Sequence, residues 1–231
     1  MAEKKPEFES EEALVGIVKG HGPCTYLLLS LIAFILLFPY AESDIPGRML
    51  LGVLYSLIMI GGALVIGRSR HIAILAFVLA GLGVALQWAA LFTGLVALVR
   101  FTSVVYVVVL ILAIGSVLRY LLRKGPVTAD KMHGALAGYI MLALLWTHIY
   151  AFLENVSPGS FSMGHTDPGD PHALYELLYF SFSTLTTVGY GDITPVTEQA
   201  RSFVMIEEFA GVFFVGVLIA RLAGLYPAPS K

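Results

Sequence analysis

Hydrophobic residues along this chain are gathered into long runs that are separated by short polar turns. A helix needs about 20 apolar residues to cross a bilayer, and six runs are close to this length. They occupy residues 23–40, 49–66, 72–92, 95–122, 132–153 and 199–220. A further apolar and aromatic segment, 172–186, is too short to span and lies between the last two runs. The pattern predicts an all-α membrane protein with six transmembrane helices and a re-entrant helix between the fifth and the sixth.

Composition agrees with this pattern. The 231 residues are 58% hydrophobic and only 13% charged, whereas soluble domains carry about 25% charged residues. The net charge of −2 gives no reason to expect a nucleic-acid partner. The six histidines lack metal-ligand spacing, so we interpret each as a solvated or interfacial residue. Soluble-enzyme motifs are missing as well, and we predict a protein that is not an enzyme and needs no cofactor.

The positions of the basic residues predict how the chain crosses the membrane. Cytoplasmic loops are enriched in Lys and Arg. If the N-terminus is cytoplasmic, the outer side holds only Arg48, Arg100 and Arg201, and the other eleven of the 14 Lys and Arg fall on the inner side. We therefore expect a multi-pass protein of the plasma membrane, with the lipid bilayer as its surroundings and both termini in the cytoplasm.

These boundaries divide the chain into five parts. We expect a cytoplasmic tail at 1–22, a four-helix membrane domain at 23–122, a linker at 123–131, a pore domain at 132–224 and a short cytoplasmic tail at 225–231.

The short stretch TTVGYGD at residues 186–192 follows the re-entrant segment. Backbone at membrane depth is tolerated only where it is buried in protein or lines a watery path. Glycine adopts a positive φ at little cost, and with glycine at every second position successive carbonyls can point the same way. We therefore predict that the carbonyls of Thr187, Val188, Gly189 and Tyr190, with the Thr187 hydroxyl, bind a dehydrated cation.

One chain supplies only one row of oxygen atoms, and a cation that has lost its water needs ligands on all sides. The sequence contains a single loop of this kind. We therefore expect a homotetramer in which four copies surround one axis. Asp192 would form an acidic ring at the outer mouth of the pore.

The run LYFSFSTLTTVGYGDITP between the last two spans resembles the pore region of potassium channels in the tetrameric, six-transmembrane cation channel superfamily. The last span resembles the inner helix of prokaryotic members, so the resemblance covers about residues 132–224. It implies a selectivity filter formed by the segment 187–191, a passive potassium-selective channel, and K+ as the permeant ligand. The filter residues implied are Thr187, Val188, Gly189, Tyr190 and Gly191.

Other residues are expected to support the filter or its movement. Many members of this superfamily brace the filter with an acid or an aromatic donor, and Ser183 and Tyr179 occupy those positions here. We predict a hydrogen bond from Tyr179 to Asp192. Glu207 is expected to hydrogen-bond the re-entrant helix from the last span, and Thr186 to support the filter. Gly211 matches a glycine at which inner helices bend.

The sequence does not determine which stimulus opens the predicted pore. The fourth span has Arg100 at one end, Arg119, Arg123 and Lys124 at the other, and no charge between them. A voltage sensor needs several charges across the field, so we predict weak or no voltage sensing. Ten residues follow Arg221, too few for a ligand-binding domain. The open alternatives are a leak pore, gating at the filter, and control by lipid, tension, pH or a separate subunit.

Three alternative functions are set against the potassium channel. A receptor or non-conducting scaffold would leave the TVGYG stretch without a role. A less selective cation channel of the same fold would conduct Na+ as well, although an intact TVGYG argues against it. A potassium transporter subunit would carry several degenerate half-filters, whereas this chain has one complete loop.

Overall fold

The computed structural model describes residues 22–41, 45–65, 70–122, 128–163 and 173–223. The predicted tails and most of the predicted linker lie outside these described residues. Within them the chain is almost entirely helical, and each predicted span coincides with a helix to within a few residues. The long helices are α2 (Pro23–Ala41), α3 (Ile45–Val65), α4 (Arg70–Thr93), α5 (Val96–Leu121), α6 (Ala129–Val156) and α8 (Glu198–Ala223). The short helix α7 (Ala173–Leu185) precedes α8.

Four of the described helices contain a segment long and apolar enough to cross a membrane. These segments are Ile74–Thr93, Ala97–Leu121, Ala129–Val156 and Glu198–Arg221. The apolar parts of α2 and α3 are shorter, at 17 and 14 residues. The structure is therefore that of an all-helical protein with four candidate membrane spans among its described residues.

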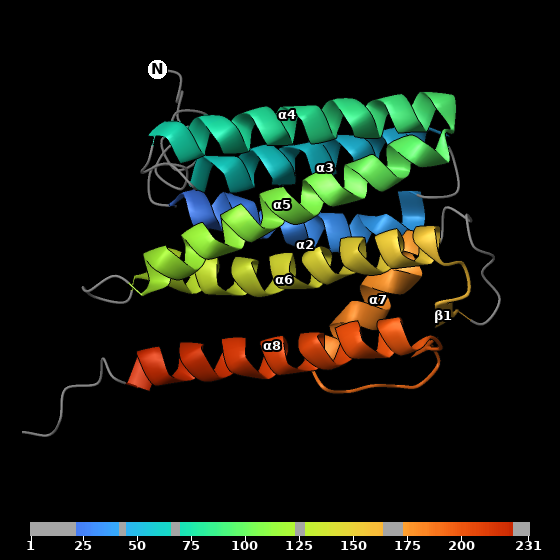
Figure 1. Ribbon diagram of the computed structural model, residues 1–231. Coiled ribbons are helices and arrows are strands. Elements are labelled where there is room, and N and C mark those ends of the chain that lie inside the picture. The colour runs from blue at the N-terminus through green and yellow to red at the C-terminus, as the bar shows by residue number, and fades with distance from the viewer. Residues whose placement is uncertain (1–21, 42–44, 66–69, 123–127, 164–172, 224–231) are drawn as a thin grey trace, which may run out of the picture.

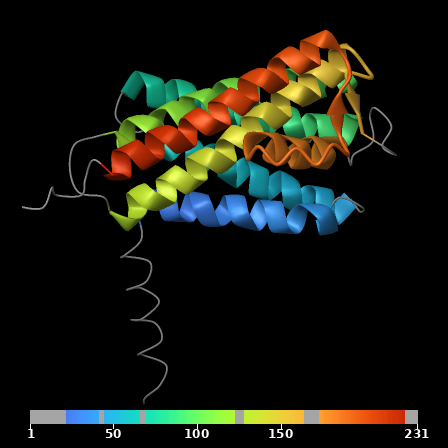
Figure 2. The same cartoon turned by 90° about the horizontal axis from the view of Figure 1, so that it is seen from below.

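Helix α6 is the centre of the fold. Figures 1 and 2 both show α6 (yellow) between α2 (blue) and α8 (red), and it packs against α2, α5, α7 and α8. In the most apolar 18-residue part of the α6 segment 67% is buried inside the protein, compared with 22% in the corresponding part of the α8 segment. Met141, Leu144 and Tyr150 of α6 are fully buried. Helix α8 therefore keeps a large uncovered apolar face in the single chain.

Polar contacts fix the two ends of α6. At its start, the Asp130 carboxylate accepts hydrogen bonds from the Cys24 N–H at 3.1 Å and from the Tyr120 hydroxyl at 3.0 Å. An acid at the N-terminus of α2 is favourable because the free N–H groups there carry partial positive charge. At the other end, Arg100 of α5 donates to the Asn155 carbonyl at 2.6 Å. The four-helix part of the chain is thus held against α6 at both ends.

A small antiparallel ribbon closes the end of the molecule beyond α6. Strand β1 (Phe161–Ser162) pairs with β2 (Thr194–Pro195), so that Phe161 lies opposite Pro195. Figure 1 shows α7 running inward from this end and the orange chain after it returning without helical structure. The segment 186–193 therefore begins at the inner end of α7 and finishes at the ribbon.

Candidate functional site

Positive φ angles occur at every second residue of the TVGYG stretch. The values are 61° at Thr187, 54° at Gly189 and 81° at Gly191. A side-chain Cβ at either glycine would meet nothing within 4 Å, so backbone conformation, and not space, is the reason for glycine here. Thr187 adopts this conformation although a positive φ is unfavourable for a β-branched residue. Strain of this kind is concentrated at functional sites.

The amide groups of the same stretch are turned toward α7. The Ser183 carbonyl accepts hydrogen bonds from the N–H groups of both Val188, at 2.9 Å, and Gly189, at 3.1 Å. The Thr187 N–H donates to the Thr184 carbonyl at 2.9 Å. The last turn of a helix has carbonyls without helical partners, and here the returning chain supplies the missing donors.

The carbonyl groups of the stretch differ from its amide groups in the described part of the chain. Within the described part of the chain, no backbone N–H donates to the carbonyl oxygens of residues 187–190. The side chains of Val188 and Tyr190 are 54% and 69% exposed in the single chain. Among the described residues, the carbonyl oxygens of 187–190 therefore accept no backbone hydrogen bond.

Tyr179 connects α7 to the outer end of the stretch. Its hydroxyl donates to Oδ2 of Asp192 at 2.8 Å, and its ring is stacked on that of Tyr190, with centroids 6.0 Å apart and planes at 7°. The other carboxylate oxygen of Asp192 accepts from the Ile193 N–H at 3.0 Å. A tyrosine hydroxyl is protonated at neutral pH, and the bond to Asp192 raises the pKa of Tyr179 to about 12, so the hydroxyl remains a donor at alkaline pH as well.

The side chains of Ser183 and Thr186 make hydrogen bonds to α7, and their predicted support of the stretch stays a prediction. The Ser183 hydroxyl donates to the Phe180 carbonyl at 2.9 Å within its own helix, and its backbone carbonyl makes the contact with the TVGYG amides. The Thr186 hydroxyl donates to the Phe182 carbonyl at 2.7 Å. Neither side chain reaches the stretch directly.

Glu207 lies where α6, α7 and α8 meet and is completely buried. Its two carboxylate oxygens accept hydrogen bonds from the Tyr150 hydroxyl of α6 and the Ser181 hydroxyl of α7. The Ser181 hydroxyl also lies 3.0 Å from the Ala143 carbonyl. The neighbouring Glu208 is exposed. Glu207 thus joins three helices behind the TVGYG stretch, and its role in supporting that stretch stays a prediction.

Gly211 of α8 packs directly on the end of α7. A Cβ at this position would lie 2.3 Å from the Leu185 carbonyl oxygen. The same oxygen accepts a hydrogen bond from the Tyr139 hydroxyl of α6 at 3.0 Å. Close helix packing is therefore a sufficient reason for this glycine, and bending at Gly211 stays a prediction.

Two buried polar residues were not identified from the sequence as structural. His148 was interpreted as solvated or interfacial, but it is only 5% exposed and is hydrogen-bonded to the Tyr55 hydroxyl. It lies on the wall of a cavity of about 590 Å³ between the four-helix part and α7. Glu154 accepts from the N–H groups of Gly159 and Phe161, at 2.6 and 3.0 Å, and so shapes the turn before β1. An acid four residues before the Pro158-Gly159 pair was the only sequence signal for it.

Comparison with known proteins finds one family that matches this part of the chain and several similar proteins. Residues 138–226 match a family described as "Ion channel". The chain is 30% identical over 99 residues to two-pore potassium channel 5 of Arabidopsis thaliana, which covers 43% of this chain and 24% of that protein. It is 40% identical over 65 residues to two pore potassium channel c of Oryza sativa subsp. japonica, which covers 28% of this chain and 14% of that protein.

A bacterial relative is similar over a shorter segment. The voltage-gated potassium channel Kch of Escherichia coli (strain K12) is 38% identical over 52 residues, which is 22% of this chain and 12% of that protein. No solved structure matches the chain. The chain spans about a quarter or less of the length of these relatives. These similarities are to an ion channel family and to potassium channels, each over part of the chain.

Proposed function

We propose that this protein is a potassium-selective channel, in which four copies of residues 187–191 form the selectivity filter. The observation that carries the proposal is the alternation of positive φ at Thr187, Gly189 and Gly191, in a stretch whose carbonyls at 187–190 accept no backbone hydrogen bond from the described residues. Rings of backbone carbonyls replace the hydration shell of K+ in filters of this sequence. Helix α7 acts as the pore helix, and Asp192 attracts cations at the mouth.

The uncovered face of α8 supports the tetramer. Met205, Ile206, Phe209, Val212 and Phe213 are each at least 55% exposed in the single chain. Exposed apolar side chains along a helix need either lipid or another subunit to cover them. Four α8 helices packed around the axis cover part of this face and bring the four TVGYG stretches together.

Six membrane crossings follow if α2 and α3 also span. Their helical lengths are 19 and 21 residues, which at 1.5 Å per residue gives about 28 and 32 Å. The hydrocarbon core is about 30 Å thick, so both helices are long enough although their purely apolar parts are short. The excess of basic residues on one side then supports a cytoplasmic position for both termini, and we propose the plasma membrane as the location.

Ion flux tests this proposal. The full chain is reconstituted into liposomes, and uptake of Rb+ or K+ is followed with and without barium. We expect uptake that barium blocks, and a protein without flux would contradict the proposal. Reversal potentials under opposed K+ and Na+ gradients separate the two channel candidates. A potential near the K+ equilibrium value supports potassium selectivity, and one near the Na+ value overturns it.

A further inference from the structure

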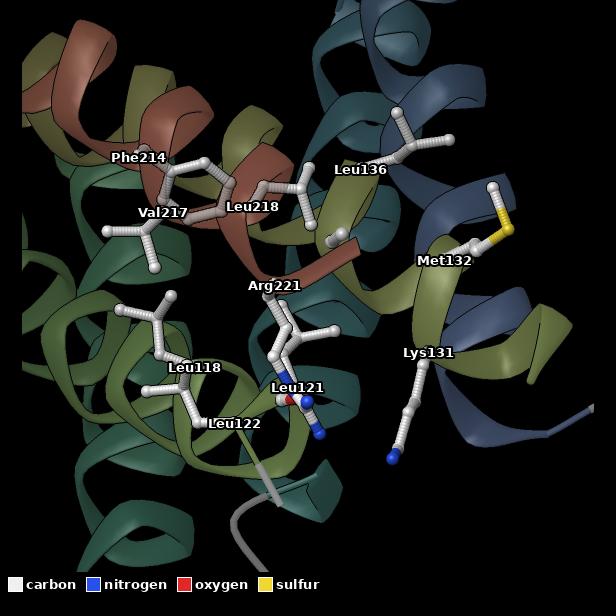
Figure 3. A pocket seen from close by; sticks show the side chains of 11 residues that line it. Leu118, Leu121, Leu122, Lys131, Met132, Leu136, Phe214, Val217, Leu218 and Arg221 are labelled. Carbon is white, nitrogen blue, oxygen red and sulfur yellow. The ribbon is translucent and has the colours of Figure 1, made fainter. Parts of the chain in front are cut away.

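Cavities lie at both ends of the described helices. Figure 3 shows the smaller one, of about 130 Å³, where the end of α5, the start of α6 and the end of α8 meet. Its walls are mainly apolar, so they do not distinguish one apolar occupant from another. The larger cavity, of about 590 Å³, is lined by residues from α2 through α7 and lies at the end that carries the β1–β2 ribbon. Its volume is within the range of about 300–1,000 Å³ that small-molecule sites have.

Polar and apolar side chains occupy different depths of this larger cavity. We define its rim by Arg100 and Pro158, which are exposed, and its floor by Tyr55, Tyr106 and His148, which are 4%, 2% and 5% exposed. Arg100 lies six positions before Tyr106 in α5, so at 1.5 Å per residue the floor is about 9 Å below the rim. The apolar side chains of the walls include Phe34, Phe38, Leu51, Leu91, Leu174 and Leu177.

The floor is both aromatic and polar. The ring centroid of Tyr55 lies 4.9 Å from that of Tyr106 and 5.5 Å from that of His148. Tyr55 is hydrogen-bonded to Nε2 of His148, and Tyr106 to the side chain of Gln87. The Nδ1 of His148 has no hydrogen-bond partner among the described residues. Buried polar atoms normally have a partner, so the floor favours an occupant that brings polar atoms as well as a ring.

Arg100 gives the rim a positive charge, and it is the one Lys or Arg among the described residues that line the cavity. Its Nη2 donates to the Asn155 carbonyl at 2.6 Å, which uses one of the five N–H groups of the guanidinium. Glu154 also lines the cavity, but its two carboxylate oxygens accept from the N–H groups of Gly159 and Phe161. The hydrogen bond of Arg100 therefore goes to an uncharged carbonyl, while the nearby carboxylate is bound to backbone amides.

We propose that this cavity binds a small aromatic carboxylate, with the carboxylate at Arg100 and the ring between the apolar walls. A guanidinium binds a carboxylate through paired, charge-assisted hydrogen bonds, and aromatic rings pack well against one another. A depth of about 9 Å suits one or two rings. It is too short for the extended acyl chain of a membrane lipid, which covers half of the hydrocarbon core, or about 15 Å.

This binding goes beyond the proposed conduction of ions, and it connects two parts of the chain. Leu174 and Leu177 of the cavity wall belong to α7, the proposed pore helix, whereas most of the other lining residues belong to the four-helix part and α6. One bound molecule therefore contacts both the four-helix part and α7.

Calorimetric titration of the full chain in phosphatidylcholine nanodiscs tests the site without any measurement of ion flux. The probe is trans-cinnamate, and cinnamamide is its uncharged counterpart with the same ring and length. Titration of empty nanodiscs corrects for partition into the lipid. We expect cinnamate to bind about tenfold more tightly than cinnamamide, which corresponds to about 1.4 kcal/mol. Equal affinities for the two probes, or no binding of cinnamate, would overturn the proposal.

Substitutions of Arg100 test the contact with the carboxylate. Arg100→Gln should remove the preference for cinnamate over cinnamamide, and Arg100→Lys should keep part of it. Arg201→Gln is the matched control, because Arg201 is exposed and donates to the Pro195 carbonyl near the same end but does not line the cavity. A similar loss in Arg201→Gln would indicate general attraction to a basic surface and would overturn the assignment to this cavity.

A second pair of variants tests the position of the ring without changing any charge. Ala90 of α4 lines the cavity, whereas Ala85 of the same helix is exposed and does not. Ala90→Phe should fill the space and abolish binding of cinnamate, and Ala85→Phe should bind it as the unchanged protein does. Binding that persists in Ala90→Phe would place the probe elsewhere. Gly189→Ala, in the proposed filter, should bind cinnamate normally, so failure of the filter proposal is distinguishable from failure of this one.

Discussion

The hydroxyl of Tyr179 donates a 2.8 Å hydrogen bond to the carboxylate of Asp192. This bond joins the middle of α7 to the residue that directly follows the TVGYG stretch. The stretch is therefore held at both ends, by the Ser183 carbonyl at its start and by Tyr179 at its finish.

Replacing Tyr179 with phenylalanine removes only this outer attachment. We expect Tyr179→Phe to accelerate slow inactivation and weaken barium block, because the end of the proposed filter loses its fixed position. The fold should lose no more than about 1 kcal/mol, the usual net contribution of one hydrogen bond. Single-channel recording and barium titration measure both effects. Tyr175→Phe, one turn earlier on α7, is the control, and unchanged inactivation in Tyr179→Phe would refute the brace.

Gly189 is predicted to be required for its backbone conformation. An alanine there would have to adopt a φ of 54°, which costs roughly 1–2 kcal/mol for a residue with a Cβ. Gly189→Ala should therefore lose K+ selectivity or conduct nothing, while it still folds and assembles. Gly81→Ala in α4 is the comparison, since Gly81 also has open space around its Cβ position. Normal potassium-selective flux through Gly189→Ala would count against the filter geometry.

Gly211 is predicted to be required for packing. A methyl group 2.3 Å from the Leu185 carbonyl oxygen must push α8 away from α7, and overpacking of this kind costs about 1–3 kcal/mol. Gly211→Ala should lower the melting temperature of the assembled protein. Gly216→Ala, also in α8 but with nothing within 4 Å of its Cβ, should not. A Gly211→Ala protein of normal stability with altered opening would instead favour a bending role.

Glu207 and Glu208 offer a matched pair of substitutions. Glu207 is buried and accepts from two hydroxyls, whereas Glu208 is exposed. Glu207→Leu removes both accepting oxygens, so the buried Tyr150 hydroxyl loses its acceptor at a cost of about 1–3 kcal/mol. Glu208→Leu should change stability by less than about 0.5 kcal/mol. Denaturation in detergent compares the two, and equal effects would contradict the role of Glu207 as the link between helices.

Voltage dependence is expected to be weak. The charges of α5 within the described residues are Arg100 and Arg119, near its two ends, and a charge contributes about 2.3 kcal/mol per 100 mV only if it crosses the field. The conductance of reconstituted channels should change little with voltage. Arg119→Gln should have the same conductance–voltage curve as the unchanged protein. A steep dependence that persists without ion block would show that another charge moves.

Most of the helical architecture was predictable because long apolar runs leave few alternatives. The bounds of α5 and α8 follow from where those runs end. Helices α2 and α3 were harder to predict as membrane-spanning, because their apolar parts are shorter than a full span. The predicted contacts of Tyr179 with Asp192 and of Glu207 with the re-entrant helix are present in the structure, although their functions stay predictions.

Other features depend on tertiary packing that a sequence pattern does not reveal. The positive φ of Thr187 could not be predicted, because local preference disfavours it in a β-branched residue. The burial of His148 depends on Tyr55, 93 positions away along the chain. The sequence suggested Gly211 as a point at which α8 bends. Its close contact with Leu185 could not be predicted, because it depends on the packing of α8 against α7.

The double use of the Ser183 carbonyl has a practical consequence for chimaeric proteins. Val188 and Gly189 both donate to this oxygen, so a graft of residues 187–191 alone would leave their N–H groups dependent on a host helix of another geometry. The smallest portable unit is the segment 179–192, which carries its own anchor at each end. If recipient proteins function with the segment 179–192 but not with residues 187–191 alone, the functional unit of the proposed filter includes the second half of α7 as well as the extended stretch.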